Sequence, residues 1–205
     1  ALRALLGCEG RVLPVSTERA SLCAEYGNGT QTRGEVEVDA GQSAGHAITR
    51  LWLEPEVSLH PVTAAAIDKF DAVVIGPGSF FTSLLPVLLV RGAAEALRRV
   101  RGPILLVANL MTEGQGMSHF TAAAAVQRLE ETLGRPIDLV LFNTAWPPSE
   151  VLARYKAEHK QPLEMGKMPD SCTVVTGDFW TGEIARHDRR RLAHAVWAVL
   201  ASRLL

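Results

Sequence analysis

The sequence AVVIGPGS, residues 72–79, joins a short apolar run to a glycine-rich turn. An apolar run bounded by such a turn is consistent with a buried strand. Two similar runs follow at Ile104–Val107 and Leu139–Phe142, and Cys172–Val175 is a shorter fourth candidate. Near-continuous apolar strands alternating with helical patterns indicate a parallel sheet whose two faces are both covered by helices.

Helical patterns fill the spaces between these runs. Pro61 is well placed at a helix start, and residues 62–70 continue as a short helix. Residues 80–100 are predicted to be helical and to be divided at Pro86 and Gly92. The spacing i, i+3, i+4, i+7, i+11 predicts one amphipathic helix face, made of Ala122, Ala125, Val126, Leu129 and Leu133.

Two further helices are expected near the end of the chain. One follows Pro147 and Pro148, and the other ends the chain with Leu192, Val196, Val199 and Leu200 on one face. Residues 61–205 are therefore predicted to form an α/β, Rossmann-like ligand-binding part with a mostly parallel sheet and helices on both faces.

The first 60 residues carry a different, β-rich pattern. Residues 11–15 form a short apolar run, and residues 22–26 alternate between apolar and more polar side chains. Asn28 and Gly29 interrupt this alternation, which resumes at Val36 and Val38. An Asn-Gly pair between two such segments predicts a β-hairpin with a type I′ turn. A further strand is expected at residues 51–53, so residues 1–60 are predicted to contain an N-terminal β-hairpin subdomain.

Composition excludes several classes of protein. Of the 205 residues 21 are Lys or Arg and 22 are Asp or Glu, giving a net charge of −1, which disfavours nucleic acid as the main partner. The content of 47% hydrophobic and 21% charged residues excludes wholesale disorder. No apolar run approaches the roughly 20 residues of a membrane span.

Cysteine usage and the first residues bear on the setting of the chain. Cys8, Cys23 and Cys172 are scattered and form no CxxC pair, which favours reduced thiols and a cytoplasmic location. Residues 1–7 read like the tail of a helix closed by a glycine. We therefore expect the chain to belong to a larger protein, with residues 1–60 continuing an N-terminal half that is absent.

Ligands of open parallel sheets bind beyond the carboxyl ends of the strands, and this rule selects the loops 76–83, 109–120 and 143–149. The first loop offers glycines for close backbone approach and hydroxyl groups for phosphate or sugar oxygens. Its candidate ligand-binding residues are Gly76, Pro77, Gly78, Ser79, Thr82 and Ser83. The alternative is a tight strand-to-helix turn in which Ser79 only caps the helix.

The other two loops contribute amide and hydroxyl side chains. Asn109 and Thr112 are candidates for hydrogen bonds to a base, ribose or phosphate, and Asn143 occupies the matching place on the third strand. The alternative is a polar turn that satisfies its own backbone groups. The histidines form no recognisable metal set, and no acid, base or nucleophile pattern stands out, so the catalytic residues remain unknown.

The string GPGSFFTS at residues 76–83 and NLMT at residues 109–112 resemble the central motifs of one superfamily. It contains the 2-phospho-L-lactate transferases (CofD) and the gluconeogenesis-factor-like, or YvcK-like, proteins. Segments 10–14, 32–35 and 53–55 are also similar to this family. The resemblance implies a nucleotide-ligand-binding α/β fold of CofD type, and it adds Met111 to the candidate ligand-binding residues.

The two branches imply different functions. The transferase branch implies Mg²⁺-dependent transfer of a phospholactyl-type group from a guanosine diphosphate donor to a deazaflavin acceptor. The gluconeogenesis-factor branch implies binding of a UDP-sugar, with a role in central carbon or cell-wall metabolism and no settled reaction. Phe81 and the Leu85-Pro86 pair are closer to the second branch.

The chain also departs from the family pattern. No glycine-rich nucleotide loop of the family's N-terminal strand is matched, and the acidic Pro-Gly-Glu-Thr-Asp-type stretch is replaced by residues 113–120. The favoured hypothesis is a nucleotide-sugar binding protein in which no residue is assigned as a metal ligand. The alternatives are the transferase, with Mg²⁺ as its cofactor by resemblance, and a structural module that uses the hairpin and the arginine-rich helix. The sequence is also compatible with a homo-oligomer.

Overall fold

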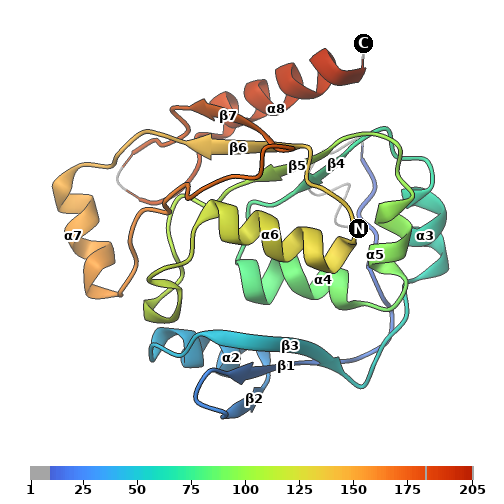
Figure 1. The fold of residues 1–205 in the computed structure, drawn as a ribbon, viewed down its shortest axis with the longest axis horizontal. Coiled ribbons are helices and arrows are strands. Elements are labelled where there is room, and N and C mark those ends of the chain that lie inside the picture. Colours follow the sequence, from blue (N-terminus) through green and yellow to red (C-terminus); the bar gives the residue numbers. More distant parts are fainter. Residues whose placement is uncertain (1–9, 183, 205) are drawn as a thin grey trace.

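The computed structural model describes residues 10–182 and 184–204, which form two sheets (Figure 1). The larger sheet has the strand order β4-β5-β6-β7 and is parallel throughout. Its strands are β4 (Val73–Ile75), β5 (Ile104–Val107), β6 (Leu139–Asn143) and β7 (Thr173–Gly177). The predicted α/β fold with a mostly parallel sheet is confirmed.

Helices cover both faces of this sheet (Figure 1). One face packs against α3 (Pro61–Ile67), α4 (Leu85–Leu89), α5 (Ala93–Arg98) and α6 (Ala122–Leu133), and the other against α8 (Arg189–Leu204). Alternate residues of β5 divide between the two cores, with Leu106 toward α6 and Leu105 toward α8. Both faces of a strand are thus apolar, which explains the continuous runs in the sequence.

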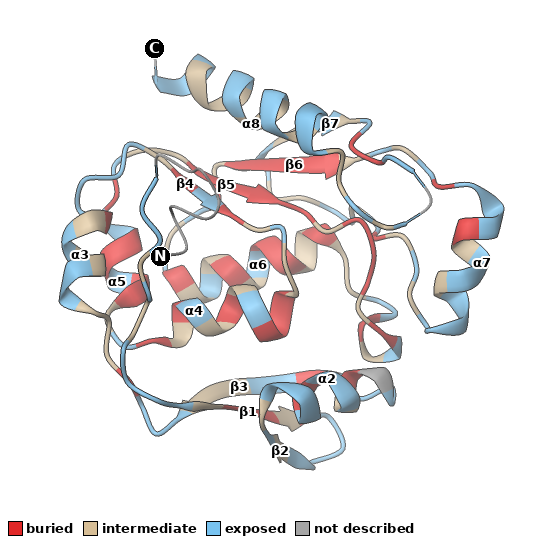
Figure 2. Ribbon diagram, turned by 180° about the vertical axis from the view of Figure 1, so that it is seen from behind, coloured by how far each residue is buried: buried red, intermediate tan, exposed pale blue. Residues whose placement is uncertain are grey.

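The amphipathic pattern of α6 is matched residue by residue. All five predicted positions are buried, including Leu129 and Leu133 at 0% exposure. The Thr121 hydroxyl accepts a hydrogen bond from the Ala124 N–H at 3.1 Å, and Gly134 ends the helix with φ 67°. Figure 2 shows the buried residues concentrated in the central strands and on the inner side of the helices.

The helical region after the glycine loop is divided as the sequence predicts. It begins as a π-helix, η1 (Phe80–Leu84), in which the Leu84 N–H donates to the Ser79 carbonyl at 2.9 Å. Pro86 lies in the first turn of α4, and Gly92 adopts φ 90° before α5. π-Helical turns occur frequently at functional sites, and this one adjoins the candidate loop.

The N-terminal part forms a three-stranded antiparallel sheet in the order β2-β1-β3. Its strands are β1 (Ser21–Tyr26), β2 (Gln31–Arg33) and β3 (Ile48–Glu54). The hairpin is confirmed, with Gly29 at φ 80° and the Asn28 side chain accepting from the Thr30 N–H at 3.0 Å. The predicted type I′ turn is wrong, because that turn needs positive φ at both central residues and Asn28 is not among the described non-glycine residues with positive φ.

Two strand predictions are wrong. Val36 and Val38 lie in a helix, α2 (Glu35–Ser43), where Val38 is buried and Val36 is 76% exposed. Residues two apart lie on the same face of a strand but on nearly opposite sides of a helix, so in α2 only Val38 of the two valines is on the buried side. Residues 11–15 belong to no strand but form an irregular segment, in which the Val15 carbonyl accepts from the His60 N–H at 2.8 Å.

The cysteines, the first residues and the lengths of the helices complete the comparison with the sequence. Cys23 and Cys172 are free thiols in buried positions, and burial raises the pKa of Cys172 to about 11. Cys8 and the helix-like start expected at residues 1–7 lie outside the described residues. In the described part of the chain, every helix is too short or too polar to cross a bilayer.

Replacing Leu129 with Ala should lower the free energy of unfolding by about 2–5 kcal/mol, because the removed methyl groups leave a cavity in the core under the sheet. Gln127→Ala on the exposed side of the same helix is the control and should change it by less than about 0.5 kcal/mol. Urea unfolding measures both. Equal losses would contradict the packing described for α6.

Candidate functional site

The loops after β4 and β5 meet beyond the carboxyl ends of these strands. The Asn109 side chain joins them, because its Nδ2 donates to the Gly78 carbonyl at 2.9 Å and its Oδ1 accepts from the Gly78 N–H at 3.3 Å. Gly76 turns the first loop with φ 82°, and a β-carbon there would lie 3.0 Å from the Val107 carbonyl. A glycine is therefore required at residue 76.

The carboxylate of Glu113 is bound between the same two loops. Its Oε2 accepts from the Ser79 hydroxyl at 2.9 Å, and its Oε1 accepts from the Phe80 N–H at 3.0 Å and from Asn109 Nδ2 at 2.8 Å. Ser79 in turn accepts from the Thr82 hydroxyl at 2.6 Å. We call Ser79, Phe80, Asn109 and Glu113 the carboxylate cradle.

The electrostatics of the cradle are set by burial. Desolvation raises the pKa of Glu113 above its ordinary value, while the hydrogen bonds from Ser79 and Phe80 act in the opposite direction. Asp39 of α2 raises the pKa further, and Lys160 lowers it. Hydrogen-bond donors favour the ionised form of a carboxyl group. The loops are therefore arranged to hold Glu113 as a carboxylate.

A pocket of about 360 Å³ opens in front of the cradle. Its loop side contains Pro77, Gly78, Asn109, Thr112 and Glu113. This volume lies at the lower end of the range for small-molecule sites, roughly 300–1,000 Å³.

Basic side chains also line this pocket. Lys160, Arg186 and His187 line it, together with Tyr155. Gln161 fixes the position of the neighbouring Lys160. The Gln161 N–H donates to the Thr112 hydroxyl at 3.0 Å, and the Gln161 carbonyl accepts from the Thr112 N–H at 2.8 Å. We call Lys160, Arg186 and His187 the cationic wall, after the lysine and the arginine among them.

The members of the wall differ in charge. Burial lowers the pKa of His187, which favours the neutral imidazole, although an interaction with the Ala108 carbonyl partly offsets this effect. Arg186 is exposed, and Lys160 is half-buried with its Nζ 2.7 Å from a Glu158 carboxylate oxygen. Arg186 therefore supplies the positive charge that is most available to a ligand in this pocket.

The sequence candidates separate into three groups. Pro77, Gly78, Asn109, Met111 and Thr112 line the pocket. Ser79 belongs to the cradle behind it, and the buried Thr82 supports Ser79.

The remaining candidates lie elsewhere. Gly76 and Ser83 line a different cavity, described below. Asn143 accepts from the Phe179 N–H at 2.9 Å and donates to the Ala145 carbonyl at 2.7 Å, so its amide holds the turn after β6.

Glu113 and Lys160 are not among the residues that the sequence singles out, and Arg186 stands out only as part of a basic run with Arg189, Arg190 and Arg191. For Glu113, an acidic residue directly after the β5 motif is a usable signal. Lys160 and Arg186 lie far from both motifs in the sequence, and only the fold brings them to the pocket.

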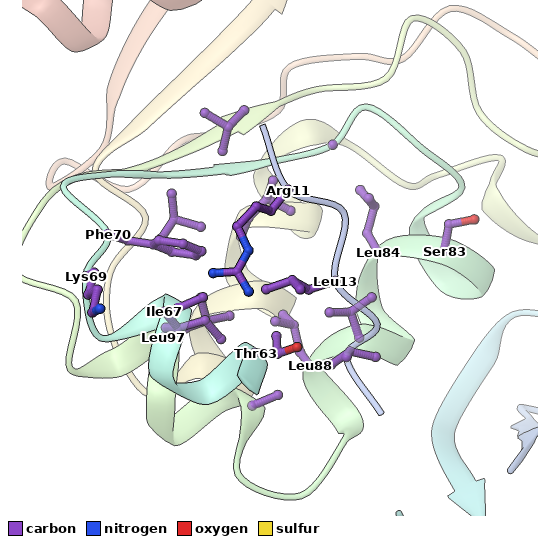
Figure 3. Close-up of a pocket in the computed structure, with 18 residues that line it drawn as sticks. Arg11, Leu13, Thr63, Ile67, Lys69, Phe70, Ser83, Leu84, Leu88 and Leu97 are labelled. Atoms are coloured by element: carbon purple, nitrogen blue, oxygen red, sulfur yellow. The ribbon is translucent and has the colours of Figure 1, made fainter. Parts of the chain in front are cut away.

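A larger cavity of about 710 Å³ lies beside β4, between α3 and α4 (Figure 3). Arg11 and Leu13 point into it from the N-terminal segment, and its other lining is mainly apolar, including Ile67, Leu88 and Leu97. Its polar groups include Arg11, Thr63 and Lys69. The pocket at the cationic wall is the candidate site because it joins the loops after β4 and β5, beyond the carboxyl ends of both strands, where ligands of open parallel sheets bind.

The described residues do not fit a metal site built by the protein. Among them, no group of three or more His, Cys, Asp or Glu side chains is placed to hold a metal ion. Both oxygens of Glu113 already accept hydrogen bonds.

The parallel sheet, its helices on both faces and a polar pocket at the strand ends define a Rossmann-like α/β protein. The family model "2-phospho-L-lactate transferase CofD" matches residues 1–180. The chain belongs to this family.

Relatives and solved structures agree with this assignment. The chain is 30% identical to a putative gluconeogenesis factor of Aquifex aeolicus, over 98% of this chain and 63% of that protein. It is 31% identical to the gluconeogenesis factor of Bacillus subtilis, over 92% of this chain and 61% of that protein. A crystal structure of a Bacillus halodurans protein of the UPF0052 family matches with TM-score 0.85 and 27% identity, covering 96% of this chain and 64% of that one.

The coverage values also show how much of each relative the chain matches. The chain spans less than two thirds of the length of these relatives.

Replacing Glu113 with Gln should change how stability depends on pH. Because the pKa of Glu113 is raised in the folded state, its ionisation stabilises the unfolded state more than the folded state. The stability of the wild type relative to Glu113→Gln should therefore fall as pH rises from the ordinary pKa of a glutamate through the folded-state pKa. Urea unfolding at several pH values measures this difference, and a rise across that interval would contradict the direction of the shift.

Proposed function

We propose that this chain binds a nucleotide sugar of UDP-sugar type, as part of a gluconeogenesis-factor-type protein acting in central carbon or cell-wall metabolism in the cytoplasm. The observation that carries the proposal is the pocket at the ends of β4 and β5. There a glycine loop held by Asn109 faces the cationic wall of Lys160, Arg186 and His187. The resemblance of the sequence to the gluconeogenesis-factor branch implies the same class of ligand, and the relatives at about 30% identity include gluconeogenesis factors.

The contacts suggest how a diphosphate would bind. The Phe80 N–H and the Ser79 hydroxyl already donate to Glu113, so a phosphate at these groups would have to displace a carboxylate. The guanidinium of Arg186 and the ammonium of Lys160 are the alternative partners, and Arg suits phosphate through paired N–H donors. We therefore place the diphosphate at the cationic wall and give the cradle the role of holding the loops.

The second candidate function is a 2-phospho-L-lactate transferase. The match to the family model of that name favours it. Transfer from a diphosphate donor needs mainly positioning and charge stabilisation, so the absence of an evident catalytic base does not argue against it. A product assay with a guanosine diphosphate donor and a deazaflavin acceptor separates the two functions, because a binding protein gives no product.

We also propose how the chain is divided. Residues 1–60 and 61–205 would be parts of one larger family fold. Within the described residues, β4 pairs only with β5, and Val74 in the middle of β4 is 43% exposed. Both faces of a parallel sheet are normally covered, so we propose that a segment from the rest of the family fold packs against this exposed face of β4.

Arg186→Gln should weaken binding of UDP-sugars by the intact protein about tenfold or more, since losing a hydrogen bond to a charged group costs about 1.5–3 kcal/mol. The melting temperature should stay unchanged because the residue is exposed. Arg189→Gln, an exposed arginine at the start of α8, is the matched control. Titration calorimetry measures both variants, and an absence of heat with every nucleotide sugar would contradict the proposed function.

A further inference from the structure

A second cavity of about 710 Å³ lies between α7 (Ser149–Ala157) and the loop that contains η2 (Gln115–Met117). Ser149, Leu152, Ala153 and Lys156 line it at the spacing i, i+3, i+4, i+7, so one face of α7 forms its wall. We call this cavity the α7 groove. Its volume falls within the range of small-molecule sites.

The groove combines an apolar wall with a basic end. Leu152, Ala153 and Pro162 provide the apolar surface, and Lys156, His159 and Lys160 provide the basic groups. Glu158 pairs with Lys160 but is not part of the lining, and in the described part of the chain no acidic side chain lines the groove. The lining is thus complementary to an anion with an apolar body.

His159 occupies a backbone conformation that side chains rarely adopt. Its φ is 56°, and it is the one positive-φ residue among the described residues that is not a glycine. The hydrogen bonds from His159 N–H to the Lys156 carbonyl and from Lys160 N–H to the Tyr155 carbonyl make this a helix end that usually carries glycine. A histidine at this position places an imidazole on the groove at the expense of backbone strain.

The groove opens beside the candidate site. Lys160 lines both cavities, and the Gln161 side chain donates to the Ser118 carbonyl, which ties the two walls of the groove together. A molecule in the groove would therefore lie next to the cationic wall.

We propose that the α7 groove binds a small anionic molecule with an apolar body. The body packs against Leu152 and Pro162, and the anionic group meets Lys156 and His159. This site does not depend on a nucleotide in the first pocket, so the two proposals stand or fall separately.

The probe is 1-anilinonaphthalene-8-sulfonate, which combines an aromatic body with a sulfonate. Added to the ¹⁵N-labelled intact protein, it should shift the amide resonances of residues 149–161 and 115–118. Lys156→Gln should weaken its affinity roughly three- to tenfold, because the lost charge is exposed and partly screened. Glu150→Gln, on α7 but outside the groove lining, is the control and should leave the affinity unchanged.

His159→Gly separates binding from folding. Glycine suits the left-handed conformation, so the melting temperature should be equal or higher while the affinity for the probe falls. Resonance shifts confined to the apolar cavity beside β4, or equal affinities of the wild type, Lys156→Gln and His159→Gly, would overturn the proposal. Because the probe contains no nucleotide, neither result bears on UDP-sugar binding.

Discussion

The carboxylate of Glu113 is the contact on which the geometry of the site depends. It accepts hydrogen bonds from the Ser79 hydroxyl, the Phe80 N–H and the Asn109 amide, and so joins the loops after β4 and β5. A half-buried carboxylate is costly unless donors surround it, and here Ser79 and Phe80 at the start of η1 supply them together with Asn109. The same negative charge occupies the place that a ligand phosphate would take at this helix start.

The parallel sheet explains why such distant residues meet. Because β4, β5, β6 and β7 run parallel, the carboxyl ends of all four strands lie at the same end of the sheet. Thr112 then pairs with Gln161, which brings Lys160 to the pocket, and residues 185–187 close it from the segment before α8. With Glu113 in the cradle, the remaining positive charge at the mouth of the pocket belongs to Lys160 and Arg186, and this distribution decides where a diphosphate is best accommodated.

The sequence was sufficient where a pattern had one structural solution. The apolar runs of β5 and β6 correspond to strands that are buried on both faces, and the spacing of α6 corresponds to one buried helix face. Val36 and Val38 were misassigned because two residues are too few to separate a strand from a helix. The loop motifs border the candidate pocket, and Glu113 follows one of them directly, but Lys160 and Arg186 depend on tertiary contacts between segments up to about a hundred residues apart, which no local pattern encodes.

The central claim is that the cradle holds the loops together while the cationic wall holds the ligand. Ser79→Ala in the intact protein tests it through a paired measurement of melting temperature and affinity for a UDP-sugar. We predict a stability loss of about 1–2 kcal/mol, because Glu113 loses a donor, with affinity close to that of the wild type. An unchanged melting temperature with affinity reduced roughly ten- to a hundredfold would contradict the claim and place the phosphate on the Ser79 hydroxyl.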